Sequence, residues 1–208
     1  LGTAINVSAM RRQLTLLKEM GINGIRTSHN PPAPEWLDLC DEMGFIVMDE
    51  AFDVWKRPME GSPYNYQLYF DDWYAKDLAD QVLRDRNHPS VFMWSIGNEI
   101  PEQWGTGMDT TGRVIARSMA KIIKELDTTR MVTSALNYVS NDNNFYRSGA
   151  LDIIGINYHH SQWKDLGTDL FQGDKPWIIS ESVSPLATRG HYDMPSDSIR
   201  RWSGFEEN

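Results

Sequence analysis

The stretch Val91-Phe-Met-Trp-Ser-Ile-Gly-Asn-Glu99 is an almost unbroken apolar run that ends in a carboxylate. A shorter run with the same ending, Pro176-Trp-Ile-Ile-Ser-Glu181, follows later in the chain. Short apolar runs bounded by loop-like sequence are typical of strands with both faces buried. A carboxylate at the tip of such a strand is poorly placed for solubility and well placed for chemistry. The two runs therefore predict a pair of functional carboxylates, Glu99 and Glu181.

Helix-like and strand-like segments alternate on both sides of these runs. Apolar residues recur at helical spacing, for example at Met10, Leu14 and Leu17, and a glycine such as Gly21 or Gly44 ends the helical segment. The expected helices cover residues 8–20, 34–43, 71–86 and 111–126, with a further helix over 163–171; the expected strands cover 22–26, 45–49, 90–97, 131–134, 153–157 and 177–180. This alternation predicts a parallel sheet with helical crossovers.

Two architectures fit such a sheet, a doubly wound open sheet and an eight-stranded barrel. No glycine-rich phosphate loop follows any expected strand, which argues against a nucleotide-binding open sheet. Polar residues instead follow the expected strands one after another: Arg26, His29, Asp49, Glu50, Asn98, Glu99, Asn157, Tyr158 and Glu181. Barrel enzymes build their sites from strand ends in this way, and a complete barrel needs about 250 residues. The 208 residues therefore predict an α/β fold, a single-domain (β/α)8 TIM barrel over 1–208 that lacks strand one and strand eight.

Composition excludes several classes of protein. The formal net charge of −9 provides no basic surface for a nucleic acid, and no apolar run is long enough to span a membrane. Cys40 is the only cysteine and lies in an apolar helical segment, so we expect a buried core residue and no intramolecular disulfide. One cysteine leaves the cellular compartment open.

Four stretches carry a resemblance to a known family. They are Gly21-Ile-Asn-Gly-Ile-Arg-Thr-Ser-His-Asn-Pro-Pro32, Asp41-Glu-Met-Gly-Phe-Ile-Val-Met-Asp-Glu50, Asn87-His-Pro-Ser-Val-Phe-Met-Trp-Ser-Ile-Gly-Asn-Glu99 and Lys175-Pro-Trp-Ile-Ile-Ser-Glu181. They are similar to glycoside hydrolase family 2, which contains β-galactosidases, β-glucuronidases and β-mannosidases. The resemblance implies the family's catalytic barrel, entered after strand one and left before strand eight. The family's β-sandwich domains would lie upstream of this chain.

The resemblance gives the two glutamates separate roles. It implies that Glu99 is the acid/base and Glu181 the nucleophile of a retaining hydrolase. Such an enzyme holds its two carboxyl groups about 5–5.5 Å apart, with the acid protonated and the nucleophile ionised. The alternative is that both glutamates are structural ion-pair partners.

Further residues at the ends of the expected strands are candidates to support this pair. The resemblance implies that Asn98 binds the 2-hydroxyl of the sugar, with capping of the following loop as the alternative. Arg26 could keep Glu181 ionised, or form a structural salt bridge with another barrel carboxylate. Tyr158 could donate its hydroxyl to the nucleophile, or be a core aromatic residue.

Four residues of the second and third barrel strands are further candidates. His29 and Asn30 follow the second strand in one loop, where His29 could bind a sugar hydroxyl or only order the loop. Asp49 and Glu50 end the third strand. We expect one of them, Asp49, to contact substrate, with pairing to Arg26 as the alternative.

The sequence predicts no metal or other cofactor. Family β-galactosidases often bind magnesium through a carboxylate and a histidine after strand three. Asp53 can stand for the carboxylate, but Trp55 occupies the histidine position, and the adjacent His159 and His160 alone do not make a metal site. Trp55, with Trp104 and Trp163, lies after a strand, where an aromatic face can stack on sugar or simply pack.

The expected activity is hydrolysis of terminal β-linked sugars, most closely of β-galactosidase type. The galactose preference rests on overall resemblance, and β-glucuronidase or β-mannosidase are the alternatives. A different class of function stays open as well, a non-catalytic carbohydrate-binding barrel or an inactive fragment. The expected partner is an oligosaccharide, polysaccharide or other glycoside, and neither a nucleic acid nor a membrane; a homo-oligomeric parent protein is compatible with the resemblance.

Overall fold

Six parallel strands form one sheet in sequential order. The computed structural model describes residues 4–58, 63–105, 108–171 and 175–183. The strands are β1 (Gly24–Arg26), β2 (Ile46–Glu50), β3 (Val91–Asn98), β4 (Met131–Leu136), β5 (Ile154–Asn157) and β6 (Trp177–Glu181), paired in the order β1-β2-β3-β4-β5-β6. A doubly wound sheet reverses its strand order at a switch point, whereas the wall of a barrel does not. The six predicted strands are confirmed, and their order is that of a barrel wall.

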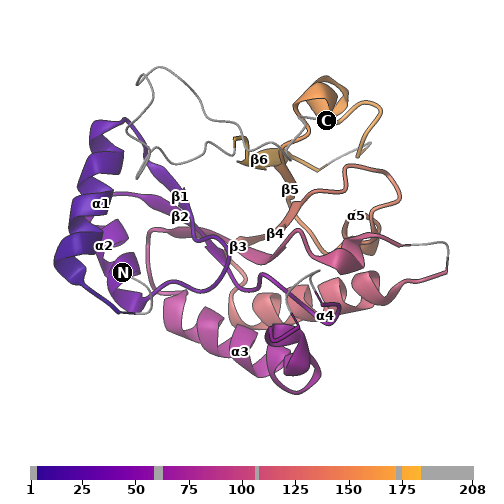
Figure 1. Ribbon diagram of the computed structural model, residues 1–208, viewed down its shortest axis with the longest axis horizontal. Helices are drawn as coiled ribbons and strands as arrows, with labels where there is room; N and C mark the ends of the chain where they lie inside the picture. The colour runs from indigo at the N-terminus through magenta and orange to yellow at the C-terminus, as the bar shows by residue number, and fades with distance from the viewer. Residues whose placement is uncertain (1–3, 59–62, 106–107, 172–174, 184–208) are drawn as a thin grey trace.

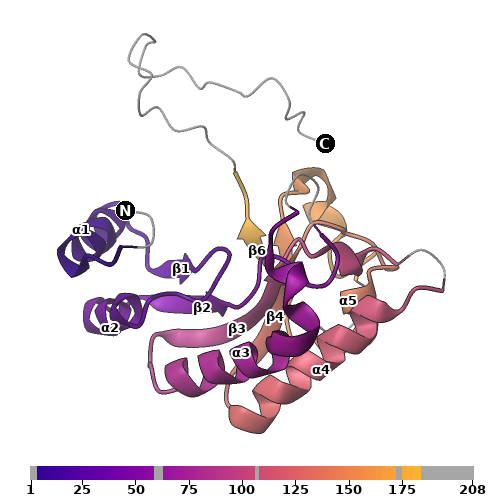
Figure 2. The same cartoon turned by 60° about the horizontal axis from the view of Figure 1, so that its bottom comes forward.

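The main helices lie along this wall. Helices α1 (Val7–Glu19) and α2 (Pro34–Met43) lie at the β1–β2 end, and α3 (Phe70–Asp85) and α4 (Thr111–Leu126) lie beside β3 and β4 (Figures 1 and 2). Shorter pieces are α5 (Asn144–Ser148) and the 3₁₀ helices η1 (Tyr66–Leu68), η2 (Pro101–Gln103) and η3 (His160–Asp165). Within the described residues, no helix has the length and apolar character needed to cross a membrane.

Local sequence sets the ends of α2. Pro34 stands in the first turn, where its missing N–H group costs no helical hydrogen bond. Gly44 ends the helix with a φ of 70°, and its N–H donates to the carbonyl of Cys40. This abrupt end allows β2 to begin at Ile46.

Alternation along the strands gives the sheet two different faces. Trp94 and Ile96 of β3 are fully buried in the main core, which also contains Phe70 of α3. Met93, the residue before Trp94, belongs instead to a small second cluster with Met48. The helix-covered outer face therefore supplies most of the apolar core, and the inner face is left for other side chains toward the strand ends.

One predicted helix is wrong and one short helix was not predicted. Residues 163–171 do not form a continuous helix, because η3 gives way to turns after Asp165. Gly167 and Phe171 there adopt positive φ values of 80° and 50°, which a right-handed helix does not allow. Helix α5 forms between β4 and β5, where the Asn143 side chain accepts the first N–H groups and Gly149 ends the helix in a left-handed conformation.

Candidate active site

Five strand ends bring a polar cluster together at one edge of the sheet. β1 ends at Arg26, β2 at Glu50, β5 at Asn157 and β6 at Glu181, and Glu99 directly follows β3. Parallel strands present their carboxyl ends at the same edge, so residues far apart in sequence become neighbours. Arg26 and Glu181, 155 positions apart, form an ion pair at 2.6 Å.

The Glu181 carboxylate contacts one cation and one hydroxyl, in addition to the Asn157 amide. Arg26 Nη1 donates to its Oε1, and the Tyr158 hydroxyl donates to its Oε2. Burial raises the pKa of Glu181, but the Tyr158 hydrogen bond and the Arg26 charge outweigh burial and leave the pKa below its ordinary value. Glu181 is therefore kept ionised.

The Glu99 carboxylate is held by amides instead. Asn137 Nδ2 donates to Oε2 at 2.8 Å, and Asn157 Nδ2 donates to Oε1 at 2.9 Å. Among the described residues, no lysine, arginine or histidine forms an ion pair with Glu99. The Glu99 N–H donates to the Ala135 carbonyl, which ties the residue to the end of β4.

Asn157 joins the two glutamates. Its Nδ2 lies 2.9 Å from Glu99 Oε1 and 3.0 Å from Glu181 Oε1. Placed end to end, these two contacts limit the separation of the two Oε1 atoms to about 6 Å. The carbonyl of the same amide accepts from the Ser180 hydroxyl at 2.7 Å, which fixes its orientation from β6.

Arg26 is anchored on its other side by Glu50. The two side chains form a bidentate pair, with Nε at 3.0 Å from Oε2 and Nη2 at 2.9 Å from Oε1. Glu50 is fully buried and also accepts from the Ser95 hydroxyl at 2.7 Å. Of the alternatives for Arg26, contact with Glu181 and a salt bridge with another carboxylate, both are therefore present at once.

The orientation of the Asn98 amide follows from its neighbours. Arginine can only donate, and Arg26 Nη2 lies 2.6 Å from Asn98 Oδ1, so this end of the amide is the carbonyl. Asn157 Nδ2 lies 3.1 Å from the same oxygen. The Asn98 NH2 group then points the other way, where its nearest acceptor is Asp53 Oδ1 at 3.4 Å.

His29 lies against the Arg26–Glu50 pair. Its Nδ1 is 3.1 Å from Arg26 Nη2 and 3.2 Å from Glu50 Oε1. Nδ1 thus faces a donor and an acceptor: without a proton it accepts from Arg26, and with a proton it donates to Glu50 Oε1. The Glu50 contact raises the pKa of His29 against the opposing effects of burial and of Arg26.

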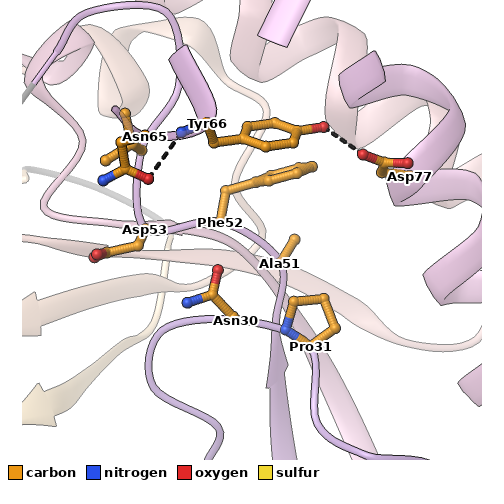
Figure 3. A pocket seen from close by; sticks show the side chains of 9 residues that line it. Asn30, Pro31, Ala51, Phe52, Asp53, Asn65, Tyr66 and Asp77 are labelled. Atoms are coloured by element: carbon orange, nitrogen blue, oxygen red, sulfur yellow. Dashed lines mark hydrogen bonds between the residues drawn. The ribbon is translucent and has the colours of Figure 1, made fainter. Parts of the chain in front are cut away.

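A pocket of about 270 Å³ opens beside this cluster. Figure 3 shows Asn30 from the loop after β1 and Asp53 from the loop after β2 on its wall. Phe52 and Tyr66 also line the pocket, with their rings stacked at 5.0 Å, and the Tyr66 hydroxyl donates to Asp77 at 2.6 Å. Carboxylate and amide groups beside aromatic rings suit a small polyhydroxylated ligand.

Asp49 does not join the cluster, which corrects the expected substrate contact. Successive residues of β2 point to opposite faces, so Glu50 faces the cluster and Asp49 faces α3. Asp49 is fully buried and accepts from Gln81 Nε2 at 2.8 Å. Burial raises the pKa of Asp49 well above its ordinary value, and the nearby Asp85 carboxylate adds to the effect.

Two residues of the cluster have unusual backbone conformations. Glu99 and Tyr158 directly follow β3 and β5, and their φ values are 45° and 59°. A residue with a side chain pays about 1–3 kcal/mol for such a conformation, and these conformations concentrate at functional sites. They turn the chain at the moment it leaves the sheet, which aims both side chains across the strand ends.

The family profile described as "Glycosyl hydrolases family 2, TIM barrel domain" matches residues 1–205. The chain belongs to glycoside hydrolase family 2. The profile covers nearly the whole chain, including the Arg26, Glu99 and Glu181 segments that form the cluster. The resemblance predicted from the four motifs is thereby confirmed, and the sheet is part of the family's TIM barrel.

Relatives in glycoside hydrolase family 2 carry more than one substrate name. The chain is 46% identical to beta-galactosidase BoGH2A of Bacteroides ovatus over 97% of its own length and 26% of that protein. It is 32% identical to the beta-glucuronidase of Canis lupus familiaris over 75% of its length and 22% of that protein. The crystal structure of a family member from Bacteroides cellulosilyticus superposes with a TM-score of 0.76 at 38% identity, over 86% of this chain and 22% of that one. The chain thus spans about a quarter of these relatives.

The residues after β2 do not fit the magnesium site of family β-galactosidases. Trp55 stands where the motif has histidine; it is fully buried, stacks on Phe145 at 4.6 Å, and donates its indole N–H to the Ile96 carbonyl. An indole has no lone pair to offer a cation. Among the described residues, no group of three histidine, cysteine or acidic side chains is placed to hold a metal.

The contacts of Asn137 and Asn157 with the glutamates were not predicted from the sequence. Asn157 appeared only among the polar residues that end strands, although it contacts both glutamates. Asn137 follows the last residue of β4 and could have been found by the same rule, had β4 been predicted to run to Leu136. Trp104 is partly exposed near this end of the site and its ring lies 6.3 Å from that of Tyr138.

Proposed function

We propose that this chain carries the catalytic machinery of a retaining, exo-acting β-glycosidase. The observation that carries the proposal is the shared Asn157 amide, which keeps the Glu99 and Glu181 oxygens within about 6 Å. That limit applies to one oxygen of each carboxylate, and it accommodates the ~5–5.5 Å carboxyl separation of retaining enzymes.

The reaction proceeds by double displacement. An ionised Glu181 oxygen bonds to the anomeric carbon while the bond to the leaving oxygen breaks, and Glu99 gives its proton to that oxygen. A water then gives its proton to Glu99 as its oxygen bonds to the anomeric carbon, and the Glu181 ester bond breaks. Both glutamates return to their starting protonation states, and the sugar keeps its configuration.

Asn98 supports the first step as a hydrogen-bond donor. Its carbonyl is occupied by Arg26 and Asn157, which leaves the NH2 group for a ligand. The long 3.4 Å contact with Asp53 is readily exchanged for a sugar hydroxyl. A hydrogen bond to the 2-hydroxyl that strengthens in the transition state supplies several kcal/mol in enzymes of this kind.

The charges around the pocket favour an uncharged sugar, which supports the β-galactosidase type over the β-glucuronidase alternative. Arg26 is already paired with two carboxylates, Glu50 and Glu181. Asp53 adds a further carboxylate on the pocket wall, and none of the described cations forms an ion pair with it. A uronic acid would bring its own carboxylate toward this excess of negative charge, whereas a neutral hexose would not.

The six described strands are fewer than the eight of a complete barrel. We assign β1–β6 to strands two to seven of the eight, which puts Glu99 after strand four and Glu181 at the end of strand seven. Strands one and eight of such a barrel are not among the described strands.

A substrate panel and an active-site label test the proposal in the protein that carries this chain. Nitrophenyl β-galactoside should be turned over faster than the glucuronide, mannoside and glucoside. Asp53→Asn removes one negative charge. It should therefore lower the ratio of kcat/KM for the galactoside to kcat/KM for the glucuronide about tenfold. A 2-fluoroglycoside should label Glu181, located by peptide mass spectrometry. Binding without turnover across the panel would favour a carbohydrate-binding barrel, and a label on another residue would overturn the nucleophile assignment.

A further inference from the structure

Two side-chain amides connect the Glu99 carboxyl group to the loop that follows Glu99 in the sequence. Four residues after Glu99, Gln103 of η2 is fully buried and its Nε2 lies 2.6 Å from Asn137 Oδ1. Asn137 Nδ2 in turn lies 2.8 Å from Glu99 Oε2. We propose that Gln103 and Asn137 form a relay that positions the Glu99 carboxyl group for proton transfer, an inference that rests on the acid/base role proposed above.

The direction of the relay is fixed by backbone groups. The N–H groups of Asn137 and Tyr138 lie 3.2 and 3.0 Å from Gln103 Oε1, and Asn143 Nδ2 lies 3.3 Å from it. A backbone N–H can only donate, so this end of the Gln103 amide is the oxygen. The other end is the NH2 group, and it must face the carbonyl of the Asn137 amide. Asn137 therefore has only its own NH2 group left for Glu99.

The loop that carries Gln103 is itself held firmly. The neighbouring Glu102 is fully buried, and its Oε1 accepts from the backbone N–H groups of Lys56 and Arg57 at 3.1 and 2.7 Å. These bonds tie η2 to the loop after β2. The relay thus starts from a rigid support and ends on a carboxylate that no described cation holds.

The chemical purpose of the relay is orientation. Glu99 must present one oxygen to the leaving group, and a misplacement of about 1 Å can cost about 10²-fold in rate. With Asn157 on Oε1 and Asn137 on Oε2, the carboxyl plane is fixed at both oxygens. Without Asn137, only the Asn157 contact and the backbone of Glu99 would set this plane. Gln103 and Asn137 are positioning residues, because neither is required to touch the substrate.

The test compares leaving groups in the protein that carries this chain. We would measure kcat/KM, which reports the first displacement, for dinitrophenyl, nitrophenyl, phenyl and alkyl β-glycosides of the best sugar. A good leaving group needs little help from an acid. Asn137→Ala should therefore lower kcat/KM about 10–100-fold on the alkyl and phenyl substrates and less than about threefold on the dinitrophenyl substrate. Gln103→Glu should cause a smaller loss of kcat/KM with the same preference for good leaving groups, since it removes the N–H that orients Asn137.

Gln81→Ala is the matched control. Gln81 also donates a buried amide N–H to a carboxylate at 2.8 Å, but its partner Asp49 lies on the other face of the sheet. The control should lower the melting temperature without changing the dependence on leaving group. If Asn137→Ala does not fold, Asn137→Leu, which removes the donor, keeps a similar volume and adds no charge, takes its place.

The outcomes separate the relay from the function on which it rests. Glu99→Ala, run beside the other variants, should show the steepest dependence on leaving group. Equal losses on all substrates for Asn137→Ala, or no loss, would overturn the relay when Glu99→Ala keeps its steep dependence. Equal losses on all substrates for Glu99→Ala would instead overturn the acid role and the proposed function with it.

Discussion

The two glutamates sit in contrasting surroundings although one amide touches both. The Glu181 side of the site contains a guanidinium and a phenol, Arg26 and Tyr158, which favour a carboxylate that stays charged. The Glu99 side contains only neutral amides, from Asn137 and Asn157. In the proposed function the two identical side chains have different tasks, and enzymes assign such tasks to paired carboxylates by what lies next to each one.

Removing the Glu181 carboxylate should have the largest effect on activity. Glu181→Ala removes the proposed nucleophile and leaves Glu99 in place, so kcat should fall by about 10⁴-fold or more. Added azide, small enough to enter the vacated space, should restore turnover and give a glycosyl azide of inverted configuration, detected by NMR. A product of retained configuration would show that the second displacement still operates and that Glu181 is not the nucleophile.

Removing the Glu99 carboxylate should have a smaller and more selective effect. Glu99→Ala should cost about 10²–10⁴-fold on substrates with poor leaving groups and much less on dinitrophenyl glycosides, because only the former need a proton. Azide should here give a glycosyl azide of retained configuration, since it attacks the intermediate formed with Glu181. Azide products of the same configuration from both variants would contradict the assignment of different roles to Glu99 and Glu181.

Removing one donor from Glu181 should change its pH dependence. Burial raises the pKa of Glu181, while Tyr158 and Arg26 bring it below the ordinary value. Tyr158→Phe leaves burial less opposed, so the pKa should rise and the acidic limb of the kcat/KM profile should move to higher pH. We expect about a tenfold loss of activity near neutrality. An acidic limb that stays in place would mean that the remaining contacts, with Arg26 among them, are enough to keep Glu181 ionised.

The sequence predicted the elements of the fold and the two central residues. The apolar runs that end at Glu99 and Glu181 become β3 and β6, because strands buried on both faces need no alternating pattern. Support of Glu181 was one of the two interpretations that the sequence left open for Arg26 and for Tyr158, and both lie within hydrogen-bonding distance of it.

The connections between neighbours were less predictable. The Gln103–Asn137–Glu99 chain depends on which way two amides face, and that is set by backbone N–H groups from a different strand end. The orientation of Asp49 and Glu50 depends on strand register, where a shift of one residue exchanges the two faces. Residues 163–171 have apolar side chains at Leu166 and Phe171 that suit a helix, yet both are buried by turns.

The adjacent carboxylates Asp49 and Glu50 offer the mildest test, because they separate the face that holds the site from the face that holds the core. Asp49 has a pKa raised by burial and by Asp85, so its neutral form stabilises the fold. That stability is present at low pH and is lost as the pH rises through the raised pKa. Asp49→Asn imitates the neutral form and keeps an oxygen for Gln81.

In urea unfolding from pH 4 to 8, the free energy of unfolding of the Asp49→Asn variant should equal that of the unchanged protein at the acidic end. At the alkaline end the variant should be more stable than the unchanged protein by about 1 kcal/mol or more. Its kcat/KM should stay within about twofold, since no contact of Asp49 reaches the glutamate pair. Glu50→Gln, the same change one residue later, should lower both stability and activity, because Glu50 holds Arg26 through two hydrogen bonds. A loss of activity in the Asp49→Asn variant equal to that in Glu50→Gln would mean that both faces of β2 serve the site.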